Sequence, residues 1–247
     1  YAHQPNCRFN ADANTGHGFA ILLASVGALR LRLRRRLTWA LYGELPVKTI
    51  EEAIAALRNA WPLIKSECLS VLGSELHYQA MIYHALRISG NVPANQIGMN
   101  VKMWIENPIS ELFKELDVRK NKNYQGGFEP IPDVVIFKPS IDSDWRRRNR
   151  QNTLRNMFIA VEIKASERAK SRLSAAEIEL DIRKLSAHRE EVLNMGSSML
   201  PVMLIIDSAP SERERMTSSA LQQSYALAKN LNVAFMYASP TLEICSI

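Results

Sequence analysis

The chain has 247 residues, of which 47% are hydrophobic, so it can bury a substantial core in one large domain or in one domain with an extension. This composition excludes an intrinsically disordered protein. Its three cysteines, Cys7, Cys68 and Cys245, lie far apart and form no C-x-x-C pair, which argues against a disulfide framework and a structural zinc site. A reducing, cytoplasmic compartment fits this cysteine usage best.

The positive charge is concentrated in two runs of arginine. One run lies between Arg30 and Arg36 and contains five arginines. The other consists of Arg146, Arg147, Arg148, Arg150 and Arg155. Removing these ten arginines would change the net charge from +6 to −4, so the basic character is local. Local positive patches indicate a polyanionic partner such as nucleic acid, although a solvated face or a flexible arm would explain a single run equally well.

The first apolar segment, residues 18–29, is only twelve residues long, whereas a transmembrane helix needs about 17–25. We therefore expect no membrane association. Arginines follow this segment instead of preceding it, which argues against a secretory signal and leaves an arginine-rich organellar presequence or a nucleoid-associated protein as alternatives. The chain begins at Tyr1 and not at Met, so a fragment or a processed product is a further interpretation.

Helical patterns dominate the chain up to residue 72. Thr49 is a suitable N-cap followed by two glutamates, and Pro62 is expected to interrupt or begin a helix. Residues 29–33 alternate Leu with Arg and fit a strand equally well. We predict a mainly helical, basic N-terminal extension over residues 1–72, available to dock a second copy of the chain or a partner protein. A single domain over residues 73–247 is expected to follow it.

From Ser74 onward helices and strands alternate regularly. Ser74 caps a helix that runs to about residue 87, and Ser174 with Glu177 forms a capping box for a second long helix that ends near Gly196. Apolar runs rich in β-branched residues and bounded by turn residues predict strands. The predicted strands cover residues 96–105, 131–137, 157–164, 201–206 and 232–237, and the other predicted helices cover residues 110–116 and 211–230.

Three charged residues coincide with two of these strands. Asp133, in the one Pro-Asp pair of the chain, opens the strand at 131–137, and Glu162 and Lys164, in its one E-x-K, close the strand at 157–164. Because side chains alternate along a strand, Glu162 and Lys164 share one face. The residues expected on the other, buried face are Ile159, Val161 and Ile163.

If the two strands pair, their carboxylates meet and form a site for a hard cation with a lysine at its edge. The alternative is that Asp133 ends a turn and that Glu162 and Lys164 form an ordinary exposed ion pair on an edge strand.

This pattern resembles the PD-(D/E)xK superfamily, the restriction-endonuclease-like nucleases, and the matching residues are Pro132, Asp133, Glu162 and Lys164. The resemblance covers roughly residues 74–237, where the predicted order α-β-β-β-α-β is the order of the superfamily's core. It implies an α/β fold with a mixed central sheet flanked by helices, to which the helical N-terminal extension is added.

The resemblance also implies a metal-dependent nuclease site. Asp133 and Glu162 would bind Mg²⁺, for which Mn²⁺ is expected to substitute, and the backbone carbonyl of Ile163 would be a further ligand. Lys164 would orient the attacking water and offset negative charge. Glu75, in the first turn of the first core helix, is implied as a further catalytic and metal-binding acid, although a glutamate there also stabilises the helix dipole.

Other polar residues are weaker candidates for the same site. Gln79, one turn after Glu75, is placed to bind a metal water or a phosphate. Asp181 and Lys184 could approach the site from the helix after the E-x-K strand, but charged residues on an amphipathic helix usually form its solvated face. The histidines His77, His84 and His188 form no metal-ligand pattern.

The connection between the two motif strands, residues 138–156, is longer than a hairpin needs, so it is expected to be functional or disordered. It carries Trp145 and the second run of arginines. Both of its ends lead into strands with a catalytic carboxylate, so we expect these arginines to grip nucleic-acid phosphates. A mobile, solvated loop is the alternative interpretation.

We therefore predict a Mg²⁺-dependent endonuclease that hydrolyses phosphodiester bonds, with DNA as the preferred substrate and RNA as an open alternative. A nucleic-acid-binding or assembly module on the same fold, with weak or lost cleavage, is the main rival, and the intact Asp133, Glu162 and Lys164 argue against it. A non-nuclease α/β protein with an accidental motif is the third possibility, which a failure to bind divalent metal would favour.

Overall fold

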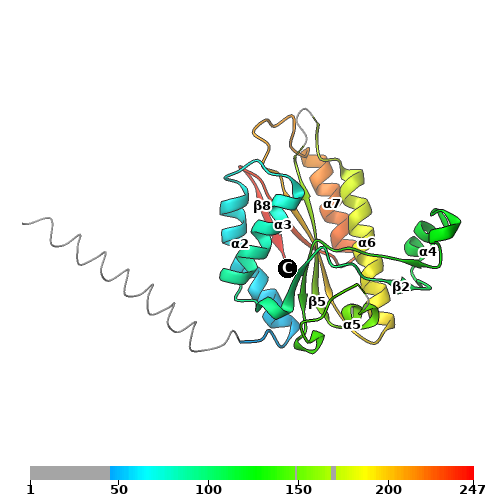
Figure 1. The fold of residues 1–247 in the computed structure, drawn as a ribbon. Helices are drawn as coiled ribbons and strands as arrows, with labels where there is room; N and C mark the ends of the chain where they lie inside the picture. Colours follow the sequence, from blue (N-terminus) through cyan, green and yellow to red (C-terminus); the bar gives the residue numbers. More distant parts are fainter. Residues whose placement is uncertain (1–44, 148, 168–170) are drawn as a thin grey trace, which may run out of the picture. The chain divides into compact units, whose positions relative to one another are not determined.

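A six-stranded mixed sheet forms the centre of the fold (Figure 1). The computed structural model describes residues 45–147, 149–167 and 171–247, so every prediction made for residues 1–44, and Arg148, lies outside the described residues. The strands, in spatial order, are β1 (Ile97–Met99), β4 (Val134–Phe137), β5 (Met157–Ala165), β6 (Leu200–Ile206), β7 (Ala234–Ala238) and β8 (Glu243–Ser246).

The strand directions follow from the connections. β1, β4 and β5 pair antiparallel, β5, β6 and β7 pair parallel, and β8 returns antiparallel to β7. Parallel pairing needs long crossovers, which α6 (Ala175–Asn194) and α7 (Ser218–Asn230) supply. The predicted α/β class, a mixed sheet flanked by helices, is confirmed.

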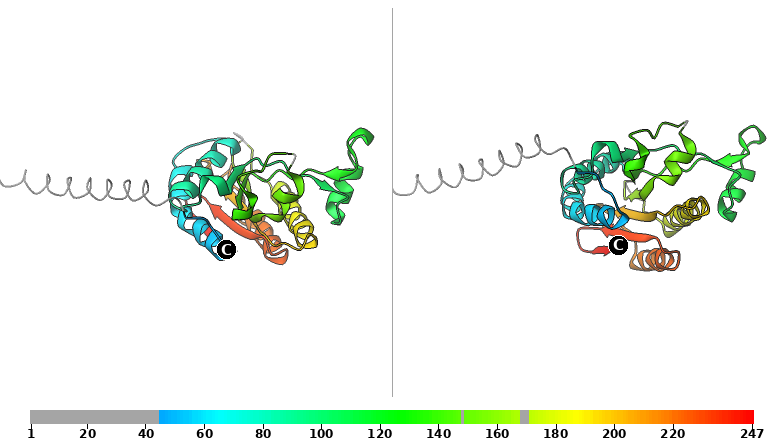
Figure 2. Two further views of the ribbon diagram at one scale, coloured as in Figure 1. Left: turned by 60° about the horizontal axis from the view of Figure 1, so that its bottom comes forward. Right: turned by 90° about the horizontal axis from the view of Figure 1, so that it is seen from below.

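Helices cover both faces of this sheet (Figure 2). α2 (Ile50–Cys68) and α3 (Glu75–Ile88) pack on the face that buries Ile159, Val161 and Ile163 of β5, as predicted, whereas α6 and α7 pack on the other face. Since α2 and α3 share one core, the compact unit begins at Leu45, upstream of the predicted boundary at residue 73. Among the described helices, none combines the length and the apolar character that crossing a membrane requires.

Local capping signals begin the helices where the sequence predicts them. The side chains of Thr49 and Ser74 each accept the third N–H of their helix, α2 and α3. Ser174 and Glu177 form the predicted capping box of α6, and the chain leaves that helix through Gly196, whose φ is +73°.

The prediction that Pro62 interrupts or begins a helix is wrong, because Pro62 lies inside α2. It is exposed, so water can satisfy the backbone carbonyl that loses its N–H partner. The neighbouring Trp61 and Ile64 are buried and hold this stretch of helix against the sheet.

The predicted strand over residues 96–105 consists of two short strands. β1 ends because Asn100 takes a left-handed backbone conformation, with a φ of 49°, and leaves the path of the strand. β2 (Ile105–Glu106) then pairs antiparallel with β3 (Gly127–Phe128) in a separate two-stranded sheet.

The C-terminal elements also differ from the prediction. α7 begins at Ser218 and not near residue 211, because the buried Asp207 accepts the N–H of Met216 and holds the preceding loop. A further strand, β8, follows the strand predicted to be last, and its Glu243 accepts a hydrogen bond from the indole N–H of Trp61 on α2.

In its described residues, the long connection from β4 to β5 forms two short helices and packs against the sheet. Its Trp145 stacks on Phe137 of β4 with ring centroids 5.3 Å apart. The connection contains η3 (Pro139–Ile141) and α5 (Arg150–Arg155), and the remaining short helices are η1 (Ala94–Gln96) and η2 (Lys122–Tyr124).

β2, β3 and α4 (Glu111–Val118) form a projection that stands away from the central sheet (Figures 1 and 2). We refer to residues 104–129 as the β2–β3 projection. Phe113 stacks on Phe128 inside it, with centroids 4.1 Å apart. The buried Glu191 of α6 anchors it, because its carboxylate accepts two backbone N–H groups just before α4, at 2.9 and 2.8 Å.

Replacing Glu191 by Ala should loosen the projection, because two N–H groups would lose their acceptor. We expect the free energy of unfolding to fall by about 1–3 kcal/mol and hydrogen exchange over residues 109–118 to accelerate. Glu190→Ala removes the exposed neighbouring glutamate and is the matched control, with neither change expected. Equal exchange rates in the two variants would contradict the anchoring role.

Candidate active site

The β4–β5 pairing brings Asp133 beside Glu162. Val134 pairs with Val161, and the N–H of Asp133 donates to the carbonyl of Val161 at 3.0 Å. The next antiparallel pair therefore joins Asp133 and Glu162. The two motif strands pair as predicted, and the alternative of an ion pair on an edge strand is wrong, since β5 lies between β4 and β6.

Hydrogen bonds from two sides orient the carboxylate of Asp133, which is only 8% exposed. Its Oδ2 accepts the backbone N–H of Ile163 at 2.6 Å, and its Oδ1 accepts Nε2 of Gln79 at 2.5 Å. Oε1 of Gln79 in turn accepts Nδ2 of Asn100 at 2.8 Å. Gln79, predicted to bind a metal water or a phosphate, thus has a positioning contact with Asp133.

Glu162 is partly buried, and none of the described residues donates a hydrogen bond to its carboxylate. Burial raises its pKa to about 8, and the negative charges of Asp133 and Asp181 add to this rise. Burial likewise raises the pKa of Asp133 to about 6, although the N–H of Ile163 and the charge of Lys164 oppose it. A positive charge placed between the two carboxyl groups would therefore stabilise their ionised forms.

Lys164 lies between two further carboxylates. Its Nζ is 3.3 Å from Oε2 of Glu75 and 3.4 Å from Oδ2 of Asp181. Burial lowers the pKa of Lys164, but the negative charges of Asp181, Glu75 and Glu162 together raise it by more. The pKa of Lys164 therefore stays above its ordinary value. The lysine is therefore an ammonium ion at neutral pH. Its contacts place Glu75, predicted as a catalytic and metal-binding acid, against the lysine.

The helix behind the motif strand also reaches the site. Asp181 is buried and pairs with Lys184 at 2.8 Å as well as with Lys164. Asp181 and Lys184 thus both lie near the motif. The amphipathic pattern of the helix does not by itself show whether they face the motif or the solvent. Four carboxyl groups, those of Glu75, Asp133, Glu162 and Asp181, face two ammonium groups here, and a divalent cation that displaces the proton of Glu162 would balance the charge.

The oxygen atoms of this site determine whether it fits the Mg²⁺ ion that the resemblance implies. In the described ranges, no group of three or more His, Cys, Asp or Glu side chains is arranged to hold a metal ion by itself. Mg²⁺ is commonly held by one or two carboxylates, with water and substrate phosphate completing its octahedron. Asp133, Glu162 and the carbonyl of Ile163 offer hard oxygen donors of this kind, and the lack of a donor to Glu162 leaves that carboxylate available.

A cavity of about 230 Å³ opens beside these carboxylates, lined by Glu162, Asp181, Pro132 and His188 among others. His188 is buried, its Nε2 has no partner among the described residues, and burial lowers its pKa to about 4. A neutral imidazole therefore faces this cavity. The sequence indicates the position of His188 through its spacing of seven residues from Asp181, because this spacing puts both side chains on one face of α6.

The arginines of the β4–β5 connection are less free than their sequence suggests. Arg146 pairs with Asp144 and Arg147 with Glu129, each at 2.8 Å. The guanidinium of Arg150 lies over the ring of Trp104, 5.8 Å from its centroid. Arg155 is exposed, and Arg148 lies outside the described residues. Asp144 and Glu129, which lie outside the run of arginines, thus pair with two of its members.

No protein-family model matches this chain, and no characterised protein or solved structure matches it significantly. The resemblance to the PD-(D/E)xK nucleases therefore depends on Pro132, Asp133, Glu162 and Lys164 and on the order of the elements that carry them.

The stability of the metal-free protein should depend on the protonation of Glu162. Its pKa rises from an ordinary 4.5 to about 8 on folding, so between these values the folded state holds a proton that the unfolded state has released. This stabilisation is present below the lower value and is lost as the pH rises through the upper one. We expect the melting temperature in EDTA to fall across this range, and Mg²⁺ to restore it most at the alkaline end.

Glu162→Gln isolates this effect, because its amide cannot ionise. The difference in melting temperature between this variant and the wild type in EDTA should grow as the pH rises. A difference that does not change with pH would contradict the raised pKa.

Proposed function

We propose that this protein is a metal-dependent endonuclease that hydrolyses phosphodiester bonds, with DNA as its preferred substrate. The observation that carries the proposal is the juxtaposition of Asp133 and Glu162 on paired strands, with Lys164 two residues further along β5. Buried carboxyl groups with raised pKa values bind a cation in place of a proton, and strongly perturbed groups of this kind concentrate at functional sites.

The order of the elements supports a restriction-endonuclease-like core as the finer description of the fold. Read in chain order, α3, β1, β4, β5, α6 and β6 follow the pattern α-β-β-β-α-β. The β2–β3 projection is then an insertion between the first two core strands, and α7, β7 and β8 extend the sheet beyond the core.

The carboxylates of Asp133 and Glu162 and the carbonyl of Ile163 would hold Mg²⁺ or Mn²⁺ in this proposal. When bound, the ion would polarise the scissile phosphate and lower the pKa of a water molecule. Gln79 and the N–H of Ile163 keep the Asp133 carboxylate in one orientation, so it needs little reorganisation to act as a ligand.

Lys164 would stabilise negative charge on the phosphate. Its raised pKa keeps it protonated, so it is an electrostatic group and a hydrogen-bond donor to the attacking water, not the base that removes a proton from it. Glu75 and Asp181 hold its Nζ from two sides, which fixes the ammonium beside Glu162.

The proposal is tested by incubating the protein with supercoiled plasmid, linear duplex, single-stranded DNA and RNA, in Mg²⁺, Mn²⁺ or EDTA. We expect cleavage only with divalent metal, and a loss of at least about 100-fold in Asp133→Ala and in Glu162→Ala. Glu190→Ala, an exposed acid on α6, is the matched control and should cleave normally. Cleavage that persists in EDTA, or in both active-site variants, would contradict the proposal.

Lys164→Ala should reduce turnover by orders of magnitude while metal affinity stays near that of the wild type. The variant should also melt earlier in EDTA, because the buried Asp181 and the nearby Glu75 lose their counter-charge. Lys184→Ala is the matched control, since it removes a second ammonium from Asp181 on a side chain that is 40% exposed. Equal turnover in these two variants would reduce Lys164 to a general charge effect.

A further inference from the structure

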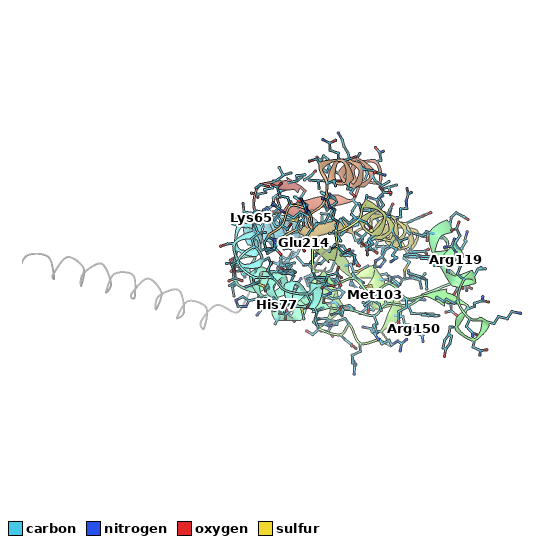
Figure 3. The ribbon with its side chains drawn as sticks, turned by 90° about the horizontal axis from the view of Figure 1, so that it is seen from above. Lys65, His77, Met103, Arg119, Arg150 and Glu214 are labelled. Carbon is cyan, nitrogen blue, oxygen red and sulfur yellow. The ribbon has the colours of Figure 1, made fainter. Side chains whose placement is uncertain are left out.

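A larger pocket, of about 940 Å³, lies between the β2–β3 projection and the connection that carries the arginines. Three aromatic side chains line it, Trp104, Tyr124 and Phe128. Arg150 lines it from the connection, and Figure 3 labels this residue together with Arg119 of the projection. Neither the fold nor the proposed catalytic chemistry needs such a pocket.

Two surfaces of this pocket suit an unpaired base, the ring of Tyr124 and the guanidinium of Arg150 that lies over Trp104. Tyr124 is 72% exposed and belongs to none of the hydrophobic core clusters of the described residues. The ring of Trp104 lies close to two cations, with Nζ of Lys120 at 5.7 Å and the guanidinium carbon of Arg150 at 5.8 Å from its centroid. Aromatic rings and guanidinium planes are the surfaces on which unpaired nucleobases stack.

The charge of the lining suits a phosphodiester strand. Four cationic and two acidic side chains line the pocket, an excess of positive charge. The ion pairs of Arg146 and Arg147 are solvent-exposed, so each contributes little to the stability of the fold. A phosphate group can therefore take the place of the carboxylate in each pair. Arg150 forms no ion pair with any described acid.

The pocket is adjacent to the candidate active site. Phe128 and Glu129 line both this pocket and the smaller cavity that contains Glu162. The chain runs from Phe128 at the end of β3 to Asp133 in five steps, which span at most about 18 Å even when fully extended. A strand bound in the pocket therefore lies within a few nucleotides of the carboxylates.

We propose that this pocket binds an unpaired stretch of nucleic acid, with bases stacked on Tyr124 and on the Arg150 guanidinium that covers Trp104, and with phosphates facing Arg146 and Arg147. The bases of a duplex are already stacked on one another and cannot use these surfaces. The substrate class of the enzyme is then a single strand or the unpaired end or flap of a duplex. Only this statement about cleavage rests on the proposed function, because binding in the pocket needs no catalysis.

Fluorescence anisotropy in EDTA tests the pocket apart from cleavage. The probes are a labelled oligo-dT of about 20 nucleotides, the corresponding oligo-U, and the blunt dT·dA duplex of the same length. We expect the wild type to bind the single strands more tightly than the duplex. Tyr124→Ala and Arg150→Gln should each weaken single-strand binding by about 10-fold and change duplex binding little. Since Tyr124 is exposed, its replacement leaves the fold intact.

Two matched controls lie on the same projection. Val118→Ala removes another exposed apolar side chain, and Arg119→Gln removes another exposed cation, and neither residue lines the pocket. Both controls should bind as the wild type does. Equal affinity for duplex and single strand, or Tyr124→Ala binding like Val118→Ala, would overturn the pocket while leaving plasmid cleavage untouched. Selective single-strand binding without cleavage of any substrate would support the pocket and overturn only the proposed nuclease.

Discussion

One antiparallel strand pair holds the candidate site together. The N–H of Asp133 donates to the carbonyl of Val161, and the Asp133 carboxylate accepts the N–H of Ile163 at 2.6 Å. These two hydrogen bonds clamp Asp133 against β5, next to a glutamate that repels it. Gln79 of α3, and Lys164 with Asp181 of α6, add contacts around these two residues. Those contacts can shape a site only because the strand pair already holds Asp133 beside Glu162.

The same clamp creates an electrostatic conflict that the fold only partly relieves. Four carboxylates share a partly buried space with two ammonium groups, and burial raises the pKa values of Asp133 and Glu162. Lys164 is the counter-charge built into the sheet, and Glu75 and Asp181 hold it in place. Excess negative charge in the folded state increases the affinity of the site for a cation, and the bound cation in turn stabilises the folded protein. This conflict is the physical basis of the proposed metal site.

Local signals in the sequence were sufficient for much of the fold. The caps at Thr49, Ser74 and Ser174 and the alternation along β5 predict elements that the structure confirms, because each depends on neighbouring residues. Contacts between distant residues could not be read this way. Gln79 donates a hydrogen bond to Asp133, 54 positions away in the sequence. Glu129 lies outside the run of arginines and forms an ion pair with Arg147, so this run is partly neutralised although its own sequence does not show it. The break at Asn100 was missed for the same reason, since its side chain bonds to Gln79 on α3 and its N–H to the carbonyl of Asp133.

We propose that Asp133 and Glu162 form a divalent-cation site. Anomalous diffraction from crystals grown with Mn²⁺ tests it most directly, because the ion is located without reference to activity. We expect one strong peak beside the carboxylates of Asp133 and Glu162, which would hold the ion together with the carbonyl of Ile163. Well-ordered Asp133 and Glu162 side chains with no peak between them, at a Mn²⁺ concentration that saturates any cleavage, would contradict it.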